Sequence, residues 1–375
     1  MADSNDLKKV LFVFGTRPEA IKMAPVIIAF KASSHFETKV CITAQHREML
    51  DQVLDFFEII PDYDLDLMQE NQDLYNLTGR VLNALKTPLE DYKPHLVFVH
   101  GDTTTTMAAS LAAFYAGSKV GHIEAGLRTL NKLAPFPEEM NRQITGRLAD
   151  FHFAPTAISK ANLRAENIDE DTIFVTGNSV IDALHSTVES LKKQAPKFTE
   201  PLLDSTKKNI LITGHRRENL NGGLRRNCEV LKTIALNRTD VNLIYPVHLN
   251  PKVQKVVYEV LGGISNVFLI APLSYPDFVW IMYNSYLIIT DSGGVQEEAP
   301  GLGKPVLVTR ETTERPEAVE AGTVLLVGTD PKKMKTAILN LLDDTNLYNK
   351  MSQAHNPYGD GKTAQRILKI IKERL

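Results

Sequence analysis

Short apolar runs recur along the whole chain, and each is followed by a turn and a stretch with one apolar face. In the first half these runs are Val10–Phe14, Lys39–Thr43, Leu96–Val99, Val120–Ile123, Phe151–Ala154 and Ile173–Val175. They are continuous rather than alternating between apolar and polar residues, which is typical of parallel strands covered by helices on both faces. The intervening pattern predicts helices near residues 18–31 and 47–57.

The same rhythm begins again after a segment rich in Lys, Ser and Pro at residues 187–208. The later runs are Asn209–Thr213, Asn242–Tyr245, Val267–Ile270, Tyr286–Thr290, Pro305–Val308 and Thr323–Leu326. The pattern therefore predicts an α/β fold of two doubly wound, Rossmann-like domains with a cleft between them. We expect one domain to comprise residues 1–177 with 358–375, and the other residues 178–357. Helices are expected at Asn178–Leu191 and Thr363–Leu375.

Composition narrows the class of protein. The 375 residues are 43% hydrophobic, which is enough to form the hydrophobic cores of two domains. The net charge of −3 indicates neither a nucleic-acid nor a membrane partner. Two cysteines distant in sequence predict no disulfide framework. The polar, acidic start does not resemble a signal peptide, and no apolar run approaches the ~18 residues of a membrane span. A cytoplasmic protein is expected.

Two carboxylates stand just after the apolar runs of one strand–helix–strand unit. Asp102 follows Leu96–Val99, and Glu124 follows Val120–Ile123. Ligands of open α/β sheets bind at the carboxyl ends of strands. We therefore expect both acids at one crevice, where such a pair is able to carry out acid–base chemistry.

Two strand-to-helix turns have the composition of anion sites. One contains Arg17 and Lys22 and is expected to offer free backbone N–H groups. The other has Ser292, Gly293 and Gly294 before a helix, with Glu298 about one turn later as a candidate for a ribose diol. The alternative interpretation is two ordinary turns with solvated charges. A nucleoside diphosphate lying across the cleft would use both.

Two further segments carry candidate chemistry that the residues alone leave open. His215, beside Arg216, follows the run Asn209–Thr213 and either exchanges a proton, binds a phosphate or is structural. Glu138 and Glu139 begin a helix after Pro137, and the pattern does not distinguish them, because acids in a first turn also suit the helix dipole. No metal-binding motif, serine-nucleophile elbow or basic-aromatic stripe is present.

Ten blocks in a fixed order carry a resemblance to a known family. Among them are GTRPEAIKMAP, VHGDTTTT, GHIEAGLRT, PFPEEMNRQ, TGHRREN and DSGGVQEEAP. From about residue 10 to 360 the chain resembles the non-hydrolysing UDP-N-acetylglucosamine 2-epimerases. The resemblance implies the GT-B fold, a homodimer that uses no cofactor or metal, and interconversion of UDP-N-acetylglucosamine and UDP-N-acetylmannosamine for surface polysaccharide synthesis.

The resemblance also implies site residues. The catalytic positions of the family match Asp102, Glu124, Glu138 and His215. Its UDP-sugar-binding positions match Arg17, Lys22, Ser292, Gly293, Gly294, Glu298 and Arg315. In the implied mechanism UDP is eliminated to leave 2-acetamidoglucal and then adds back after C2 has received a proton on its other face. Inversion at C2 needs a group on each face, so the presence of several acids suits it.

Some family members bind a second UDP-N-acetylglucosamine as an activator. The positions resembling that site are Gln45, His46, Arg216 and His248. This chain departs from the pattern with Glu48 in place of Gln and Asn71 in place of Arg. An added acid and a missing cation near a diphosphate predict weak or absent activation.

Three rival functions remain at this stage. A glycosyltransferase of the same fold would bind the same nucleotide but needs an acceptor pocket. A hydrolysing epimerase would release free N-acetylmannosamine and UDP. A non-catalytic UDP-sugar sensor would need the anion sites but not the three acids.

Overall fold

A computed structural model describes residues 7–44, 47–67, 73–198, 202–214, 222–313 and 315–375. The chain forms two compact units, one of Met1–Ala183 with Tyr358–Leu375 and the other of Leu184–Pro357. The division falls inside helix α8 (Ser179–Lys193). The domain boundary expected at residues 177 and 178 stays a prediction.

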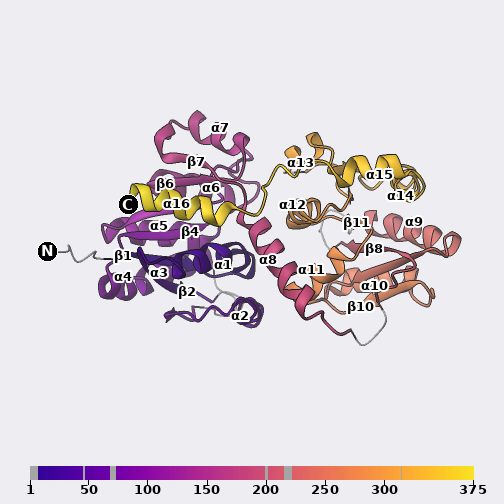
Figure 1. Ribbon diagram of the computed structural model, residues 1–375, viewed down its shortest axis with the longest axis horizontal. Helices are drawn as coiled ribbons and strands as arrows, with labels where there is room; N and C mark the ends of the chain where they lie inside the picture. The colour runs from indigo at the N-terminus through magenta and orange to yellow at the C-terminus, as the bar shows by residue number, and fades with distance from the viewer. Residues whose placement is uncertain (1–6, 45–46, 68–72, 199–201, 215–221, 314) are drawn as a thin grey trace. The chain divides into compact units, whose positions relative to one another are not determined.

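The first unit is built on a seven-stranded parallel sheet in the order β3-β2-β1-β4-β5-β6-β7 (Figure 1). Its strands are β1 (Lys8–Phe14), β2 (Phe36–Ile42), β3 (Tyr63–Asp64), β4 (Leu96–His100), β5 (Lys119–Ile123), β6 (Phe151–Ala154) and β7 (Ile173–Val175). Its helices are α1 (Arg17–Lys31), α2 (Arg47–Phe56), α3 (Leu74–Ala84), α4 (Lys86–Tyr92), α5 (Thr104–Tyr115), α6 (Glu138–Leu148), α7 (Ala157–Ala165) and α16 (Thr363–Arg374), with a 3₁₀ turn at Glu170–Thr172.

The second unit has a six-stranded parallel sheet in the order β10-β9-β8-β11-β12-β13. Its strands are β8 (Lys208–Thr213), β9 (Val241–Pro246), β10 (Val267–Ile270), β11 (Leu287–Thr290), β12 (Val306–Val308) and β13 (Val324–Leu326). Its remaining helices are α9 (Gly223–Asn237), α10 (Pro251–Leu261), α11 (Tyr275–Tyr283), α12 (Gly293–Gly301), α13 (Pro316–Glu320), α14 (Pro331–Asp343) and α15 (Thr345–Ser352).

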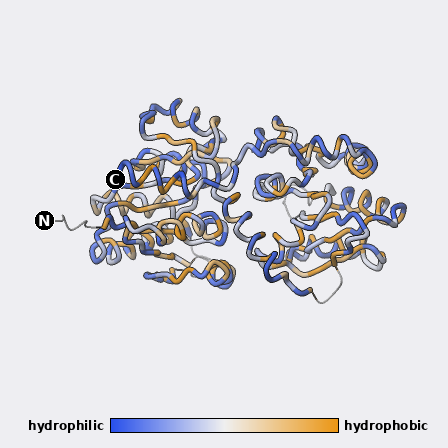
Figure 2. Tube along the Cα trace, in the orientation of Figure 1, coloured by the Kyte–Doolittle hydropathy of each residue, from blue (hydrophilic) through white to orange (hydrophobic). Residues whose placement is uncertain are grey.

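Each sheet has its own apolar core. Figure 2 shows apolar residues concentrated along the strands and mixed with polar ones along the helices. In the first unit the rings of Phe12 and Phe98 stack with centroids 4.6 Å apart. Gly121 on β5 makes room for this stack, since a Cβ there would lie 2.9 Å from the Phe98 ring. Burying each such ring contributes about 1.5–3 kcal/mol.

The structure confirms the predicted α/β fold with two parallel sheets. The strands β6, β7 and β10 have the predicted limits, and the other long strands differ by a few residues at their ends. The two-residue strand β3 and the helices α3 and α4 were not predicted. In the described part of the chain, no helix combines the length and apolar character needed to cross a membrane.

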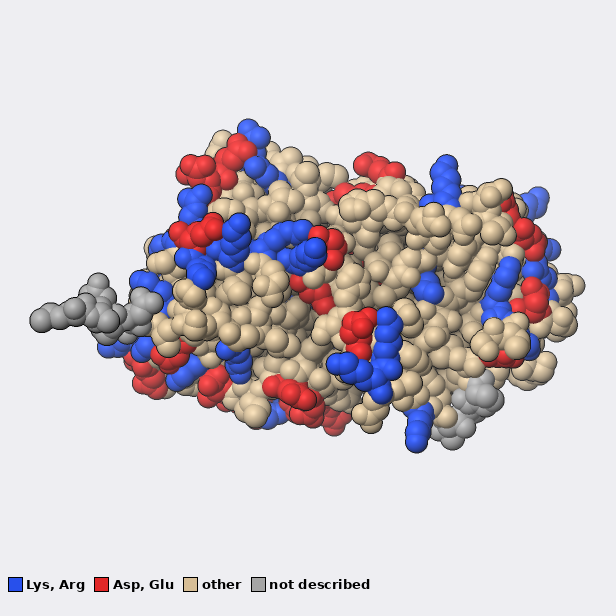
Figure 3. Space-filling model, viewed as in Figure 1, with Lys and Arg blue, Asp and Glu red and all other residues tan. Residues whose placement is uncertain are grey.

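Charged side chains stand in separate groups on the face that Figure 3 shows. Lys and Arg lie beside Asp and Glu in most of these groups, and uncharged areas separate them, so no broad area has one sign. Such a surface gives no electrostatic footprint for a nucleic acid on this face.

Candidate active site

The turn between β1 and α1 is locked by a residue to which the sequence analysis gave no role, Glu19. Thr16 caps α1, and the Glu19 carboxylate accepts hydrogen bonds from the N–H groups of Gly15 at 3.0 Å and Thr16 at 2.8 Å. It also accepts from the hydroxyls of Thr103 at 2.6 Å and Thr106 at 3.1 Å. Burial raises the pKa of Glu19, and these hydrogen bonds oppose that rise.

This locking corrects one expectation. The N–H groups of Gly15 and Thr16 are bound to Glu19 and are not available to an anion. The cationic side chains of this turn, Arg17 and Lys22, remain the candidates for a phosphate. The spacing Thr16-x-x-Glu19 is a capping-box signature, so the sequence did contain the signal.

Glu124 lies directly after β5 in a left-handed backbone conformation, with φ of +63°. Such a conformation costs an L-residue roughly 1–3 kcal/mol and is concentrated at functional sites. Its carboxylate forms an ion pair with Lys22 and accepts a hydrogen bond from the side-chain amide of Asn178 at 2.8 Å. The Nε2 atom of His100 lies 3.9 Å from the same oxygen, Oε2.

Asp102 lies two residues after the end of the neighbouring strand β4 and is held by residues of α6. Two nitrogens of Arg142 contact its Oδ2 atom, Nε at 2.9 Å and Nη2 at 2.7 Å. Asn141 donates to the Asp102 carbonyl at 2.9 Å. Burial raises the pKa of Asp102, the positive charge of Arg142 opposes the rise, and the negative charge of Glu124 adds to it. The two predicted acids therefore lie close enough to interact.

The adjacent acids at the start of α6 have different surroundings. Glu139 is fully buried and accepts hydrogen bonds from the backbone N–H groups of Thr129 at 3.0 Å and Leu130 at 3.3 Å. Arg142 contacts it at 3.1 Å. Burial acts to raise the pKa of Glu139, but its hydrogen bonds outweigh that effect and lower it. Glu138 is only partly buried, which leaves its carboxylate as the accessible one.

Three buried histidines lie on adjacent strands below these acids. They are His100 on β4, His122 on β5 and His152 on β6, and His122 pairs in register with His152. Burial lowers the pKa of His100 to about 4 and that of His122 to about 3. The His122 Nε2 atom lies 2.7 Å from the carbonyl of Gly101, which precedes Asp102. His122 thus supports the Asp102 turn as a neutral ring.

The second unit contains the predicted glycine turn. Ser292 precedes α12, and no side chain from the described residues caps this helix end. A Cβ on Gly294 would have no atom within 4 Å, so the backbone there is open to a ligand. An uncapped helix N-terminus attracts negative charge. The Ser292 N–H donates a hydrogen bond to the Thr290 hydroxyl oxygen at 2.9 Å, which fixes the turn to the end of β11.

The two acids of α12, Glu297 and Glu298, are both buried, so the interpretation of this turn as carrying solvated charges does not describe them. Glu297 is 1% exposed and forms an ion pair with Arg315, at the start of α13. Glu298 is 8% exposed. The structure thus brings Ser292, Arg315 and Glu298 together around one helix.

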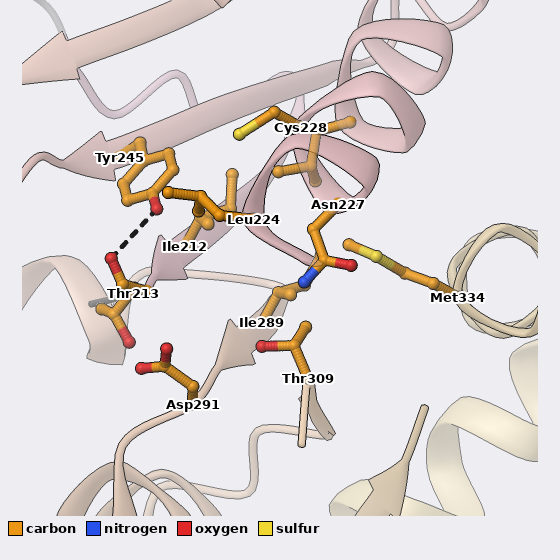
Figure 4. A pocket seen from close by; sticks show the side chains of 12 residues that line it. Ile212, Thr213, Leu224, Asn227, Cys228, Tyr245, Ile289, Asp291, Thr309 and Met334 are labelled. Atoms are coloured by element: carbon orange, nitrogen blue, oxygen red, sulfur yellow. Dashed lines mark hydrogen bonds between the residues drawn. The ribbon is translucent and has the colours of Figure 1, made fainter. Parts of the chain in front are cut away.

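A small cavity of about 20 Å³ lies behind this turn (Figure 4). Asp291, Thr213 and Tyr245 line it, and the Tyr245 hydroxyl donates to the Gly214 carbonyl at 3.2 Å. The volume is enough for about one water molecule and far below that of a nucleotide. We interpret this cavity as part of the support of the turn.

The remaining predicted residues include five whose positions the structure does not describe. His215, Gln45, His46, Arg216 and Asn71 are outside the described residues. His248 is exposed after β9, and its Nδ1 atom accepts a hydrogen bond from the Asn250 N–H at 3.0 Å. Glu48 is exposed in the first turn of α2.

Sequence reasoning missed four supporting residues, Glu19, Arg142, Asn178 and Glu297, and it did not assign a supporting role to Glu139. The most distant hydrogen-bond partner of Glu19 is 87 positions away in the sequence, and the Glu124 partner of Asn178 is 54 positions away. Only Glu19 had a local signal. The arrangement in the first unit is chemically a pair of interacting carboxylates flanked by cations.

The chain is similar to proteins of one known family. The family model described as UDP-N-acetylglucosamine 2-epimerase matches residues 28–372. The UDP-N-acetylglucosamine 2-epimerase of Salmonella typhimurium is 57% identical over 369 residues, covering 97% of this chain and 98% of that protein. That of Yersinia pestis is 56% identical over 371 residues, covering 97% and 98%.

A solved structure is also similar. It is the UDP-GlcNAc 2-epimerase of Neisseria meningitidis bound to UDP-GlcNAc, with a TM-score of 0.90 and 50% sequence identity, and the match covers 98% of this chain and 100% of that one. The matches in sequence and structure extend over both units. The chain belongs to the UDP-N-acetylglucosamine 2-epimerase family.

Proposed function

We propose that this protein interconverts UDP-N-acetylglucosamine and UDP-N-acetylmannosamine by inverting C2. The C1–O bond to UDP breaks first, which makes the C2 proton acidic. A carboxylate removes that proton, leaving 2-acetamidoglucal and UDP. C2 then receives a proton on its opposite face as UDP adds back to C1, so the atoms balance without a cofactor.

One observation carries the proposal: Asp102 and Glu124 follow the carboxyl ends of neighbouring parallel strands, and the charge of Glu124 contributes to raising the pKa of Asp102. Coupled acids share protons as a group, so no single proton is assigned to either. Glu138, the accessible acid of α6, is the third candidate. The proposed carboxylates stabilise the cationic sugar and exchange its C2 proton.

The diphosphate needs partners of the opposite sign. We assign Arg17, Lys22 and His215 to it, with the open start of α12 at Ser292–Gly294. Glu298 is proposed to bind the ribose and Arg315 the nucleotide. The Arg315–Glu297 ion pair supports this by fixing the guanidinium against α12.

Proton NMR in deuterated water tests the function. Purified protein with UDP-N-acetylglucosamine alone should give UDP-N-acetylmannosamine, with deuterium at C2 of both sugars. A glycosyltransferase would leave C2 unlabelled without an acceptor. A hydrolysing epimerase would release free N-acetylmannosamine, and a sensor would bind UDP without turnover. Any of these three results would reject the proposal.

We also propose that activation by a second substrate molecule is weak in this chain. The candidate positions Gln45, His46, Arg216 and His248 are accompanied by Glu48 and Asn71, which disfavour a diphosphate. Initial rates should therefore depend hyperbolically on UDP-N-acetylglucosamine, and UDP-N-acetylmannosamine alone should be turned over. Strongly sigmoidal rates, with little turnover of UDP-N-acetylmannosamine alone, would contradict this.

The proposed assembly is a cytoplasmic homodimer. Tyr75 on α3 is 90% exposed, and Phe114 and Tyr115 on α5 are 60% and 69% exposed. The helices α3 and α5 pack against each other, so these rings lie on neighbouring elements. Exposed aromatic groups of this kind favour a protein interface. The two free, buried cysteines, Cys41 and Cys228, suit a reducing compartment.

A further inference from the structure

Asn178 contacts the proposed acid Glu124 from the segment that leads into α8. It is 3% exposed, and its side-chain amide nitrogen donates to Glu124 Oε2 at 2.8 Å. Lys22 pairs with the same oxygen from α1. Glu124 is therefore held by donors from two elements far apart in the sequence.

The other polar groups of Asn178 fix the backbone around it. Its side-chain oxygen accepts a hydrogen bond from the Val180 N–H at 3.0 Å, which stabilises the first turn of α8. Its own N–H donates to the Tyr358 carbonyl at 2.7 Å. Tyr358 is the first residue of the chain's return to the first unit.

The segment before Asn178 has little freedom. Gly177 has φ of +92°, and a Cβ there would lie 2.8 Å from the Thr363 hydroxyl oxygen and 3.3 Å from the Tyr358 carbonyl oxygen. Asp182 on α8 also accepts from the Ala364 N–H at 2.8 Å. The outgoing and returning segments are thus packed tightly where Asn178 meets Glu124.

We infer that Asn178 is a positioning residue for the reaction: it holds the Glu124 carboxylate toward the sugar and links it to both segments that join the two units. This inference rests on the proposed function. An Asn amide suits the role because its NH₂ group donates to a carboxylate while its oxygen caps a helix. The strained backbone at Glu124 makes such external support necessary.

Two substitutions separate positioning from helix capping. Asn178→Ser keeps a capping oxygen but removes the donor to Glu124. Asn178→Asp keeps the capping oxygen and sets a second carboxylate against Glu124. Among the described residues, the charged and titratable groups that interact with Glu124 include Lys22, His100 and Asp102, and all three remain in both variants.

The expected result is a fall in kcat of about 10²-fold for Asn178→Ser, with UDP affinity unchanged, because a misplaced catalytic group slows the chemical step. Asn178→Asp should also move the acidic limb of the kcat profile upward by about one pH unit, since a like charge disfavours the ionised carboxylate. Asn250→Asp is the matched control, because Asn250 caps α10 in the same way. It should change neither value.

Unchanged kcat and an unchanged pH profile in both variants, with an active wild-type protein, would overturn this inference alone. A wild-type protein without C2 exchange would instead reject the proposed function. Asn178→Asp itself could lower the melting temperature, either through repulsion from Glu124 or through an effect elsewhere. The double variant Asn178→Asp with Glu124→Gln distinguishes these causes, because the amide introduced at position 124 then donates to the carboxylate introduced at position 178 and the contact is restored in reverse. Recovery of the melting temperature supports the contact, and no recovery overturns it.

Discussion

At the scale of single residues, the adjacent acids Glu138 and Glu139 have different surroundings, and we assign them different roles. Glu139 points into the protein, where it binds the 129–130 backbone and Arg142. Glu138 lies one residue earlier and is partly exposed. One step along a helix turns a side chain by about 100°, so adjacent residues cannot share an environment.

Glu138→Gln should therefore lower activity, whereas Glu139→Gln should lower stability. Glu138→Gln should lower kcat by roughly 10²–10⁴-fold and leave the free energy of unfolding nearly unchanged. Glu139→Gln should lower the free energy of unfolding by roughly 1–3 kcal/mol, because its amide nitrogen cannot accept the buried hydrogen bonds. Steady-state kinetics and urea unfolding of both variants check this. Equal losses of stability in the two variants would contradict the assignment.

At the scale of elements, the buried histidines of β4, β5 and β6 should make the stability of the first unit fall at acidic pH. In the unfolded chain a histidine titrates near pH 6.5, whereas His100 and His122 have pKa values of about 4 and 3 in the folded protein. Below pH 6.5 the unfolded state therefore binds protons that the folded state does not. The stability that these neutral rings contribute is therefore fully present above pH 6.5 and is lost as the pH falls toward 4.

Each of these two histidines should contribute about 1.4 kcal/mol per pH unit to that fall. His122→Gln should reduce the slope of unfolding free energy between pH 6 and 4.5 by this amount, since Gln keeps a donor for the Gly101 carbonyl. His35 is exposed, so His35→Gln serves as the control and should leave the slope unchanged. Denaturant unfolding at several pH values measures the slope. The same slope in wild type and His122→Gln would contradict this account.

Elements also show what sequence can and cannot predict. Long apolar runs predicted the strands because a strand buried on both faces leaves an uninterrupted signal. The strand β3 was not predicted, because two residues, Tyr63 and Asp64, are too few to form a recognisable pattern. Asp102 and Glu124 were predicted from their places after strands. The pairing of Asp102 with Arg142, 40 positions away, depends on how α6 packs, and no local pattern encodes it.

At the scale of the whole molecule, the aromatic residues of α3 and α5 bear on assembly. Tyr75 and Phe114 are 90% and 60% exposed, and they lie on helices that pack against each other, so they are candidates for one apolar patch. A second copy of the chain would cover them. The matched exposed residue in the second unit is Leu236 on α9, which is 63% exposed.

The double variant Tyr75→Glu with Phe114→Glu should dissociate the proposed homodimer, because charge at an apolar interface is costly to bury. Light scattering should then give the mass of one chain, 41.8 kDa, in place of two. Leu236→Glu should leave the dimer intact. A wild-type protein that is already monomeric, or a double variant that remains dimeric, would contradict the assignment of this interface.

The capping of α1 by Glu19 has a wider consequence. The N–H groups of Gly15 and Thr16 before α1 already donate to the Glu19 carboxylate and cannot bind a pyrophosphate, whereas no side chain from the described residues caps the start of α12. In the proposed function the second unit thus contributes main-chain N–H groups to the diphosphate, and the first unit contributes only side chains. Selectivity for the nucleotide and proficiency in proton exchange are then free to evolve separately.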